Sequence, residues 1–286
     1  MFNIINKRII FFAISLVVIA AGIVCLCING LNTDIDFTGG TSITVDLGVA
    51  SDENAVRSAL SSVEGLAISS VQFDGTTAII KAAAITNETD IMVKDAIKAA
   101  YPNSGLPSTE SISPTVGKEL WGNAALSIGI AAVLMLIYIT IRFEFLSGIS
   151  AVLALIHDML IMIAIYAIFR FPVNSSFIAA ILTILGYSIN ATIVIFDRIR
   201  ENSRVMKQAK FGEVVNTSIW QSMGRSINTS LTTLLTTVMV YILGVPSIKS
   251  FALPLIIGLI AGTYSSIFIA GQFWVLFKGK EAKAGR

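Results

Sequence analysis

The stretch GYSINATIVIFDRIREN, residues 186–202, begins as an apolar helix and ends in a run of charged side chains. This change is typical of a membrane-spanning helix that leaves the bilayer, because charged groups are costly in hydrocarbon. The apolar part nevertheless holds Asn190 and Thr192, on either side of Ala191. Polar side chains in a membrane helix usually bond to a neighbouring helix. The stretch therefore indicates a span with a polar contact inside the bilayer.

The composition of the whole chain supports a membrane protein. Of its 286 residues, 55% are hydrophobic and 13% are charged, and the mean hydropathy is +0.80. Soluble domains carry about 25% charged residues. A net charge of +2 gives no indication of nucleic-acid binding. Cys25 and Cys27 lie in an apolar run without metal-ligand spacing, which favours small apolar side chains in a helix over a metal or redox site.

Six apolar segments approach or exceed the length of about 20 residues that a helix needs to cross a bilayer. They are residues 9–28, 120–141, 145–169, 176–196, 227–243 and 251–277. The first is interpreted as a retained anchor, because its apolar run exceeds the usual signal-peptide core of about 7–15 residues and no A-x-A site follows. The fold class predicted is an α-helical polytopic membrane protein with six transmembrane helices.

The positions of Lys and Arg predict the orientation. If both termini are cytoplasmic, the short inner segments hold twelve of these residues, and the short outer loops hold Arg170 and Lys249. Such a bias places the basic side in the cytoplasm. The expected division is 1–29 (cytoplasmic N-terminus and first span), 30–118 (outer domain), 119–277 (the other five spans, with a cytoplasmic loop at 197–225) and 278–286 (a basic tail, expected to be disordered). Part of the loop is amphipathic enough to lie at the membrane interface or to contact a partner.

Residues 30–118 predict a small acidic α+β domain outside the membrane. They hold 11 of the 18 acidic residues, five basic residues and no His. The alternation of apolar and polar residues and the helix-capping signals indicate the order β-α-β-β-α-β, with an Asp-Gly hairpin turn at residues 74–75. This is the order of a ferredoxin-like sandwich. The strands are expected at 41–47, 67–73, 77–83 and 108–116, and the helices at 52–65 and 87–101. The scattered acids favour binding or mechanical coupling over catalysis.

Ionisable groups at membrane depth are functional candidates because of their cost in lipid. Asp158 lies mid-span beside His157, the only His in the chain. Asp158 has either a structural partner in another helix or a role in ion handling. His157 is interpreted as a packing or hydrogen-bonding residue, since one His makes no metal site. Arg225, at the entrance of the fifth span, either extends to the interface or has a polar partner within the bundle.

Hydroxyl and small residues follow helical spacing in the last three spans. A row of Thr residues that follows Arg225 on one helix face, here called the Thr stripe, predicts a polar contact surface inside a bundle, although Thr in membrane helices also bonds to its own backbone. Small residues spaced by four in the last span predict close helix packing. The Thr stripe is Thr229, Thr232, Thr233 and Thr236; a similar face of the fourth span carries Thr183, Tyr187, Asn190 and Ala191; the small residues are Gly258, Gly262, Ser266 and Ala270.

Four motifs, in order and over nearly the whole chain, together resemble the SecF family, the smaller membrane subunits of the RND-related SecD–SecF accessory translocase. They are DFTGG at 36–40, His-Asp at 157–158, the span at 175–202 and RSINTSLTT at 225–233. The first corresponds to the family's D-F-x-G-G motif, here Asp36, Phe37, Gly39 and Gly40, just outside the first span.

The resemblance implies an RND-like half bundle in the bacterial cytoplasmic membrane that pairs with SecD. The pair is expected to act beside the SecYEG channel and SecA and to help draw exported, unfolded polypeptide outward, using a proton or sodium gradient. YajC and YidC are further candidate partners. No cofactor, no nucleic acid and no enzymatic activity are expected, since the chain has no nucleophile–base set, phosphate loop or metal spacing.

The chain departs from the family at one position. Members typically read S-x-N-D-T in the fourth span, with the Asp facing the Arg of the R-S-x-N-T motif, and this chain has Ala191 in place of that Asp. The implied ion-coupling residues are therefore Arg225, Asn190 and Thr192, with Asp158 as an alternative acid. The substitution is engineered, or it is natural with SecD or Asp158 carrying the proton, or the subunit has lost coupling. Alternative functions are half of an RND-type small-molecule or lipid exporter and a passive scaffold for SecD.

Overall fold

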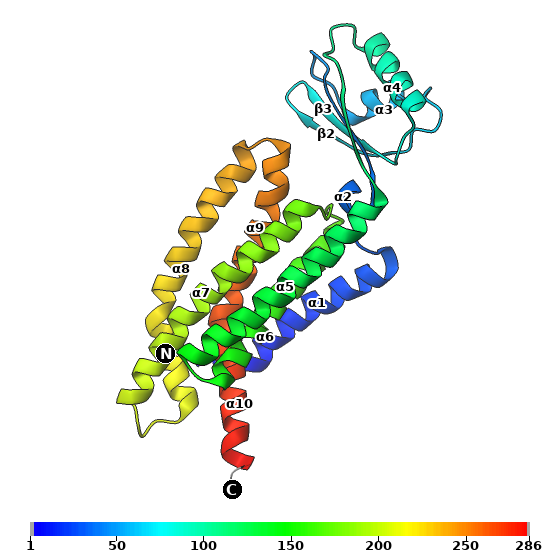
Figure 1. Cartoon of the computed structure of the whole chain (residues 1–286). Helices are drawn as coiled ribbons and strands as arrows, with labels where there is room; N and C mark the ends of the chain where they lie inside the picture. The colour runs from blue at the N-terminus through cyan, green and yellow to red at the C-terminus, as the bar shows by residue number, and fades with distance from the viewer. Residues whose placement is uncertain (1–2, 285–286) are drawn as a thin grey trace.

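The computed structural model describes the backbone of residues 3–284 and the side chains of residues 3–278. It has a long helical bundle with a small α+β domain at one end, here called the domain end, and both termini lie at the opposite, far end (Figure 1). Six helices have the length and apolar composition to cross a membrane, as predicted. They are α1 (Arg8–Asn29), α5 (Pro114–Arg142), α6 (Phe145–Phe169), α7 (Ser175–Val205), α8 (Phe211–Leu243) and α9 (Pro246–Ser265), which continues through the π-helical turn η1 (Ser266–Ala270) into α10 (Gly271–Ala284).

The α+β domain has the predicted order of elements. Its four strands form one antiparallel sheet in the order β2-β3-β1-β4, the arrangement of a ferredoxin-like sandwich. Ile43 and Ile80 from the sheet pack against Val93 and Ile97 from α4, and all four side chains are buried. The elements are β1 (Gly40–Asp46), α3 (Glu53–Ala59), β2 (Ile68–Asp74), β3 (Thr77–Ala82), α4 (Asn87–Ala100) and β4 (Ser108–Ile112).

Asp90 joins α4 to β4. Lys94 Nζ donates to Asp90 Oδ2 at 2.6 Å, and Thr109 Oγ1 donates to Oδ1 at 2.6 Å. Burial opposes ionisation of this carboxyl, but the hydrogen bonds from Lys94 and Thr109 and the Lys94 charge outweigh it, so the pKa of Asp90 lies below its ordinary value.

The last strand ends earlier than predicted. β4 stops at Ile112, and a single residue, Ser113, separates it from α5. The Ser113 side chain accepts a hydrogen bond from Thr115 N, and Pro114 occupies the first helical turn, where its missing N–H costs nothing. The residues expected to complete the strand therefore begin a membrane helix.

The segment 197–225 is not a loop, as was expected, but the ends of two helices. α7 continues to Val205 and α8 starts at Phe211, so only residues 206–210 join them. The charged side chains are solvated on the helix, where Arg198 pairs with Glu201 one turn away at 2.7 Å. Asn202 then ties the helices together by donating to Ser218 Oγ at 2.8 Å. The tail, expected to be disordered, continues α10 as far as Ala284, and residues 285–286 lie outside the described part.

Small residues allow the bundle helices to pack closely. A Cβ atom on Gly22 of α1 would lie 2.2 Å from the Cβ of Ala164 on α6. On α9, a Cβ atom on Gly258 would lie 2.5 Å from the Ile184 side chain of α7, which confirms the close packing predicted from the small-residue stripe. α8 lies at the edge of the bundle against α7 and α9 (Figure 1).

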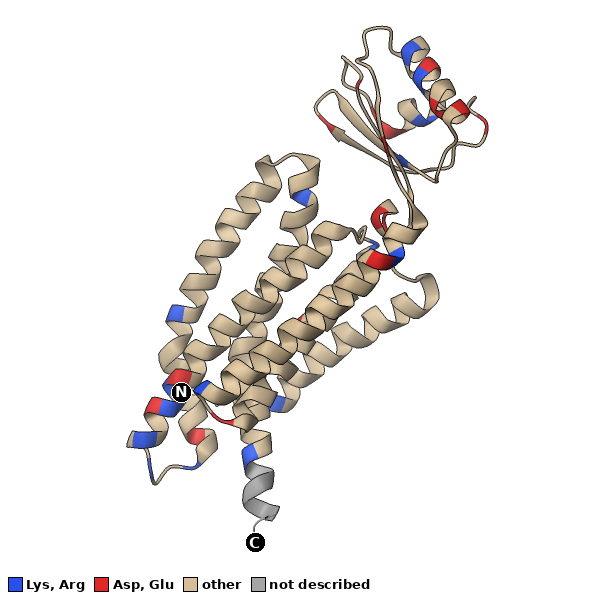
Figure 2. Ribbon diagram, in the orientation of Figure 1, with Lys and Arg blue, Asp and Glu red and all other residues tan. Residues whose placement is uncertain are grey.

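Charged residues are concentrated at the two ends of the molecule, in the α+β domain and at the far end of the bundle, while the middle of the bundle has few (Figure 2). Lys249 lies at the domain end, where it faces the same groove as β2. Arg170 lies there too, and its guanidinium donates to the carbonyls of Asn29 and Gly30 at the end of α1, both at 2.8 Å.

Candidate functional site

A small cavity between α7 and α8 brings together two of the motifs picked out from the sequence. It has a volume of about 80 Å³, and Ala191 and Arg225 both line it. The α7 residues follow the helical spacing i, i+3, i+4, i+7, and the α8 residues follow i, i+1, i+4, i+5, so one face of each helix lines the cavity. The other lining residues are Tyr187, Asn190, Val194, Ser226, Thr229 and Ser230.

Arg225 lies near the middle of α8 and is exposed on the surface of the chain. Within the described residues its guanidinium makes no hydrogen bond or ion pair, and Ala191, which lines the same cavity, offers it no acid. Asn228, on the same side of α8, is also exposed. The cavity thus has one cation, Arg225, and one amide, Asn190, but no carboxylate among its lining residues.

The Thr stripe does not form a polar contact surface inside this chain, which corrects the prediction. Thr229 Oγ1 donates to the Arg225 carbonyl at 2.9 Å, and Thr233 Oγ1 donates to the Thr229 carbonyl at 3.1 Å. Thr236 bonds in the same way to the Thr233 carbonyl at 2.8 Å. Each hydroxyl donates to its own helix, and the one hydrogen bond from another helix among the described residues is a long one of 3.4 Å, from the Tyr187 hydroxyl of α7 to Thr233 Oγ1. The Thr stripe is largely exposed.

Thr192 is separated from this cavity and faces the interior. It is 1% exposed, and its hydroxyl lies 3.0 Å from that of Ser266, where η1 begins. Ser266 Oγ also donates to the Ser188 carbonyl at 3.3 Å. The residues Asn190 to Thr192, read together in the sequence, therefore belong to two different environments.

Asp158 forms a second polar site, in the middle of the bundle. Its carboxylate is 1% exposed. Ser188 Oγ and Ser265 Oγ donate to Oδ2 at 2.6 and 2.9 Å, and His157 Nδ1 lies 3.1 Å from Oδ1. On its other side, His157 Nε2 lies 2.7 Å from the hydroxyl of Ser15 on α1. This geometry agrees with the interpretation of His157 as a hydrogen-bonding residue and of Asp158 as a residue with a partner in another helix.

Sequence reasoning missed the partners of His157 and Asp158 on other helices. Ser15, Ser188 and Ser265 lie 30 to 142 positions away from the residues they bond, on three other helices. Single serines in apolar spans carry no signal of their own. The small-residue stripe, which includes Gly262, was the sequence signal nearest to this site. A Cβ atom on Gly262 would lie 3.0 Å from Ser188 Cβ and 3.6 Å from Asp158 Oδ2, so the small size of Gly262 makes room for the site.

The D-F-x-G-G motif attaches the α+β domain to the bundle through the short helix α2 (Ile35–Thr38). Asp36 Oδ2 accepts from Ser175 N at 2.8 Å and from Ser175 Oγ at 2.7 Å, which satisfies a free N–H at the start of α7. Phe37 is buried, and its ring lies 4.4 Å from that of Trp121 on α5, centroid to centroid. The motif thus contacts two membrane helices.

The two glycines of the motif sit where larger residues do not fit. Gly39 has φ +75°, and a Cβ atom on it would lie 2.7 Å from Pro114 N, at the start of α5. One residue later, a Cβ atom on Gly40 would lie 2.6 Å from the Ala82 carbonyl oxygen of β3. Lys81 on β3 also forms an ion pair with Asp34, which precedes α2. The motif is therefore fixed to the sheet as well as to the bundle.

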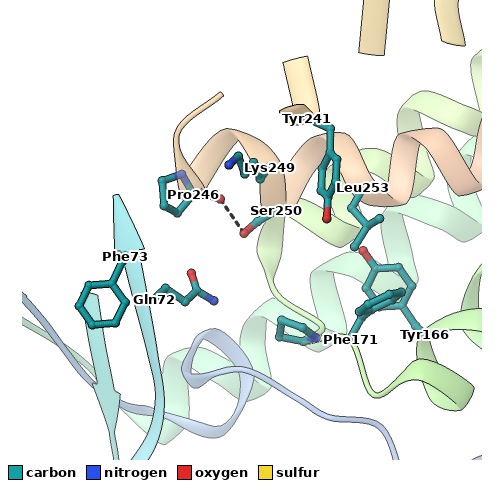
Figure 3. Close-up of a pocket in the computed structure, with 10 residues that line it drawn as sticks. Gln72, Phe73, Tyr166, Phe171, Tyr241, Pro246, Lys249, Ser250 and Leu253 are labelled. Carbon is teal, nitrogen blue, oxygen red and sulfur yellow. Dashed lines mark hydrogen bonds between the residues drawn. The ribbon is translucent and has the colours of Figure 1, made fainter. Parts of the chain in front are cut away.

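A groove of about 330 Å³ opens between the edge strand β2 and the domain end of the bundle (Figure 3). Gln72 and Phe73 line it from β2, and Lys249 and Ser250 line it from the start of α9. The α+β domain is thus firmly attached at α2 and α5 but separated by an open groove from the α8–α9 connection.

The fold defines a class of membrane protein with six candidate spans and a ferredoxin-like domain inserted between the first two. The family model described as "Protein export membrane protein SecD/SecF, C-terminal" matches residues 92–280. The chain belongs to the SecD/SecF family of protein export membrane proteins. This family consists of transport components rather than known enzymes.

Individual relatives agree with this family. The chain is 38% identical to the protein translocase subunit SecF of Alicyclobacillus acidocaldarius, over 99% of this chain and 94% of that protein. It is 39% identical to SecDF of Bacillus subtilis, over 97% of this chain but only 38% of that protein. The crystal structure of SecDF from Thermus thermophilus superposes with a TM-score of 0.85 at 31% identity, over 97% of this chain and 39% of that one.

Proposed function

We propose that this chain is a Sec protein-export subunit that pairs with SecD through the exposed polar face of α8. The observation that carries the proposal is Arg225, exposed in a membrane-spanning helix and without an ionic partner in the described residues. On the lower of the measured scales a charged residue costs about 2.5–3.5 kcal/mol at the centre of a membrane helix and less toward the interface, and Arg225 lies where the apolar part of α8 begins. A partner bundle that covers the face and offers an acid or carbonyl group removes most of this cost.

The SecDF relatives support pairing of this kind. In the proteins from Bacillus and Thermus, the part similar to this chain is under two fifths of a longer polypeptide whose name joins SecD and SecF. A separate SecD chain would supply the remainder for this subunit. In this arrangement both termini are cytoplasmic, as the distribution of basic residues predicts, and the α+β domain lies on the outer side of the membrane.

The proposed role is to help move exported polypeptide outward beside SecYEG and SecA, driven by an ion gradient. Its support is the connection from the membrane helices to the outer domain: Asp36 holds the start of α7, and Ala191, Asn190 and Thr192 lie farther along the same helix. A shift of α7 would therefore reach α2 directly. Ala191 cannot titrate, so the acid that faces Arg225 must come from the partner, or another residue of this chain must bind the ion.

Ala191 also favours a second candidate, a passive scaffold that supports SecD without coupling. Both candidates are tested by reconstituting the chain with SecD and the channel in vesicles and measuring late translocation with the ion gradient imposed or collapsed. The variants are Ala191→Asp and, as a control of equal size that cannot titrate, Ala191→Asn. A gradient response in the unmodified chain supports coupling. Absence of a response in all three supports the scaffold, and a response in Ala191→Asp alone identifies a disabled coupler.

The pairing surface has its own test. Arg225→Leu should reduce the amount of SecD that copurifies with the chain, because the remaining face no longer distinguishes SecD from lipid. Arg142→Leu is the control, since Arg142 lies on α5 and pairs with Asp197 at the far end. Equal copurification of SecD with both variants would contradict the proposed interface.

A further inference from the structure

The bundle contains a connected polar network that is separate from the cavity at Arg225. Asp158 is the most buried carboxylate of the described chain, and Ser188, Ser265 and Ser266 are each 0% exposed. Ser188 joins the network's two parts, because its hydroxyl donates to Asp158 and its carbonyl accepts from Ser266. With Thr192 and Ser15 at its ends, the network reaches α1, α6, α7 and the α9–η1 segment.

The groups that face Asp158 are hydroxyls and one imidazole, with no permanent cation among them. From its own helix it meets His157, whose ring stacks on that of Tyr264 from α9 at 6.1 Å between centroids. From α7 and α9 it meets only hydroxyls. No Lys or Arg among the described residues bonds to it. A buried carboxylate that lacks a permanent cation tends to change its charge by binding a proton.

We propose that Asp158 is the proton-binding group of this chain, with His157 as its hydrogen-bonded neighbour, and that it takes the place of the acid missing at position 191. The site itself stands on the geometry above. Only its use in translocation rests on the proposed function.

The step is a simple proton transfer. In the charged form, Ser188, Ser265 and His157 Nδ1–H donate to the carboxylate, and His157 Nε2 then accepts from Ser15. A proton from the aqueous phase adds to a carboxylate oxygen, which becomes an O–H donor and can no longer accept from every partner. Ser265 has a second acceptor in reach, the Gly262 carbonyl at 3.2 Å. Protonation thus replaces charge-assisted bonds between α6 and its neighbours by weaker neutral ones, and release of the proton restores them.

Two features favour a proton over a metal cation. The carboxylate oxygens already accept hydrogen bonds from three side chains. The site is also closely packed on the α9 side, where a Cβ atom added to Gly262 would lie 3.0 Å from Ser188 Cβ and 3.6 Å from Asp158 Oδ2. The π-helical turn that begins at Ser266 lies directly beside the site. Such turns recur at functional sites, and this one joins α9, which carries Ser265, to α10.

The direct test is infrared spectroscopy of the full chain with its partner in lipid nanodiscs, titrated across pH. The expected result is a carboxylic C=O band that appears as pH falls, is absent in Asp158→Asn and persists in the control Asp197→Asn. Asp158→Glu should retain a titrating band, which a merely structural defect would not do.

Two results would overturn the assignment of Asp158: identical titrating bands in the unmodified chain and Asp158→Asn, or a band that changes with sodium at constant pH. The role in translocation is tested separately in the reconstituted vesicles. If the unmodified chain responds to the gradient and Asp158→Asn responds equally, Asp158 is not the coupling group, although the proposed function stands. If the unmodified chain gives no response, the proposed function fails, while the infrared titration still decides whether Asp158 binds a proton.

Discussion

Gly117 offers a sharp test of how the α+β domain is attached to the bundle. It lies in the first turns of α5, and a Cβ atom on it would be 2.4 Å from the Phe37 carbonyl oxygen and 2.7 Å from the carbonyl carbon. An ordinary contact is 3.4 Å or longer, so Gly117→Ala must move α2 and α5 apart by about 1 Å. Both clashing atoms belong to the backbone, which cannot turn aside as a flexible side chain does.

The expected cost follows from a matched pair of variants. Overpacking of a close contact costs about 1–3 kcal/mol, while replacing Gly by Ala within a helix contributes about 1 kcal/mol in the opposite direction. Gly122→Ala, on the same helix, receives only the second contribution, because no atom lies within 4 Å of the new methyl group. The free energy of unfolding of Gly117→Ala should therefore be about 1–3 kcal/mol lower than that of Gly122→Ala.

Denaturant unfolding in detergent micelles measures this difference. Fluorescence of Trp121 gives a local reading as well, since the Trp121 ring packs on Phe37, and a polar quencher should reach Trp121 more easily in Gly117→Ala. The emission is isolated by replacing the other two tryptophans with Phe. Equal unfolding energies for the two variants, with unchanged quenching of Trp121, would refute the proposed contact between the motif and α5.

Three further predictions concern the attachment and the domain. Asp36→Ala removes the acceptor for Ser175 and should lower the unfolding free energy by about 1 kcal/mol, whereas Asp36→Asn, which keeps an acceptor oxygen, should lose less in the same denaturant assay. Lys81→Met leaves the buried Asp34 carboxylate without its ion-pair partner and should lower the free energy of unfolding by about 1–3 kcal/mol. Thermal unfolding checks this, and the double variant Lys81→Met with Asp34→Leu should recover part of the lost stability. Folding lowers the pKa of Asp90, so its contribution to stability is present above the unfolded pKa of about 3.9 and is lost as pH falls through the lower folded value. Asp90→Asn should therefore make the stability of the protein fall less steeply with decreasing pH in the acid range. An unchanged dependence on pH in that range would contradict this.

Much of the fold follows from local patterns in the sequence. The apolar runs predict the six spans because a bilayer demands long uninterrupted apolar helices. The pattern of the α+β domain is equally local, since alternation and turn residues mark each strand. The ends of the elements are less predictable: charged residues after Asp197 suggested a loop, but a helix extending beyond the bilayer carries the same residues on a solvated surface, and Asn202 binds it to the next helix.

The functional surfaces are harder to predict because they depend on contacts between helices. The sequence places Arg225 and the Thr residues on one face, but it does not say whether that face looks into this chain or away from it. The same holds for Asp158, whose partners Ser188 and Ser265 come from two other helices at unrelated positions. Asp36 belongs to a recognisable motif, yet its contact with Ser175, 139 positions away, follows only from the three-dimensional structure.

The one-residue junction at Ser113 has a mechanical consequence. α5 has 29 residues, so at about 1.5 Å per residue it forms a rod about 43 Å long. A single residue at its end, held by Pro114 and by the hydrogen bond from Thr115 N to the Ser113 hydroxyl, gives β4 little freedom to swivel. The sheet and α5 are therefore expected to rotate together: twisting the domain applies torque along the whole membrane helix, and rotation of the helix turns the sheet. The angle of the domain, measured with a pair of spin labels, would read the rotation of α5 from outside the bilayer.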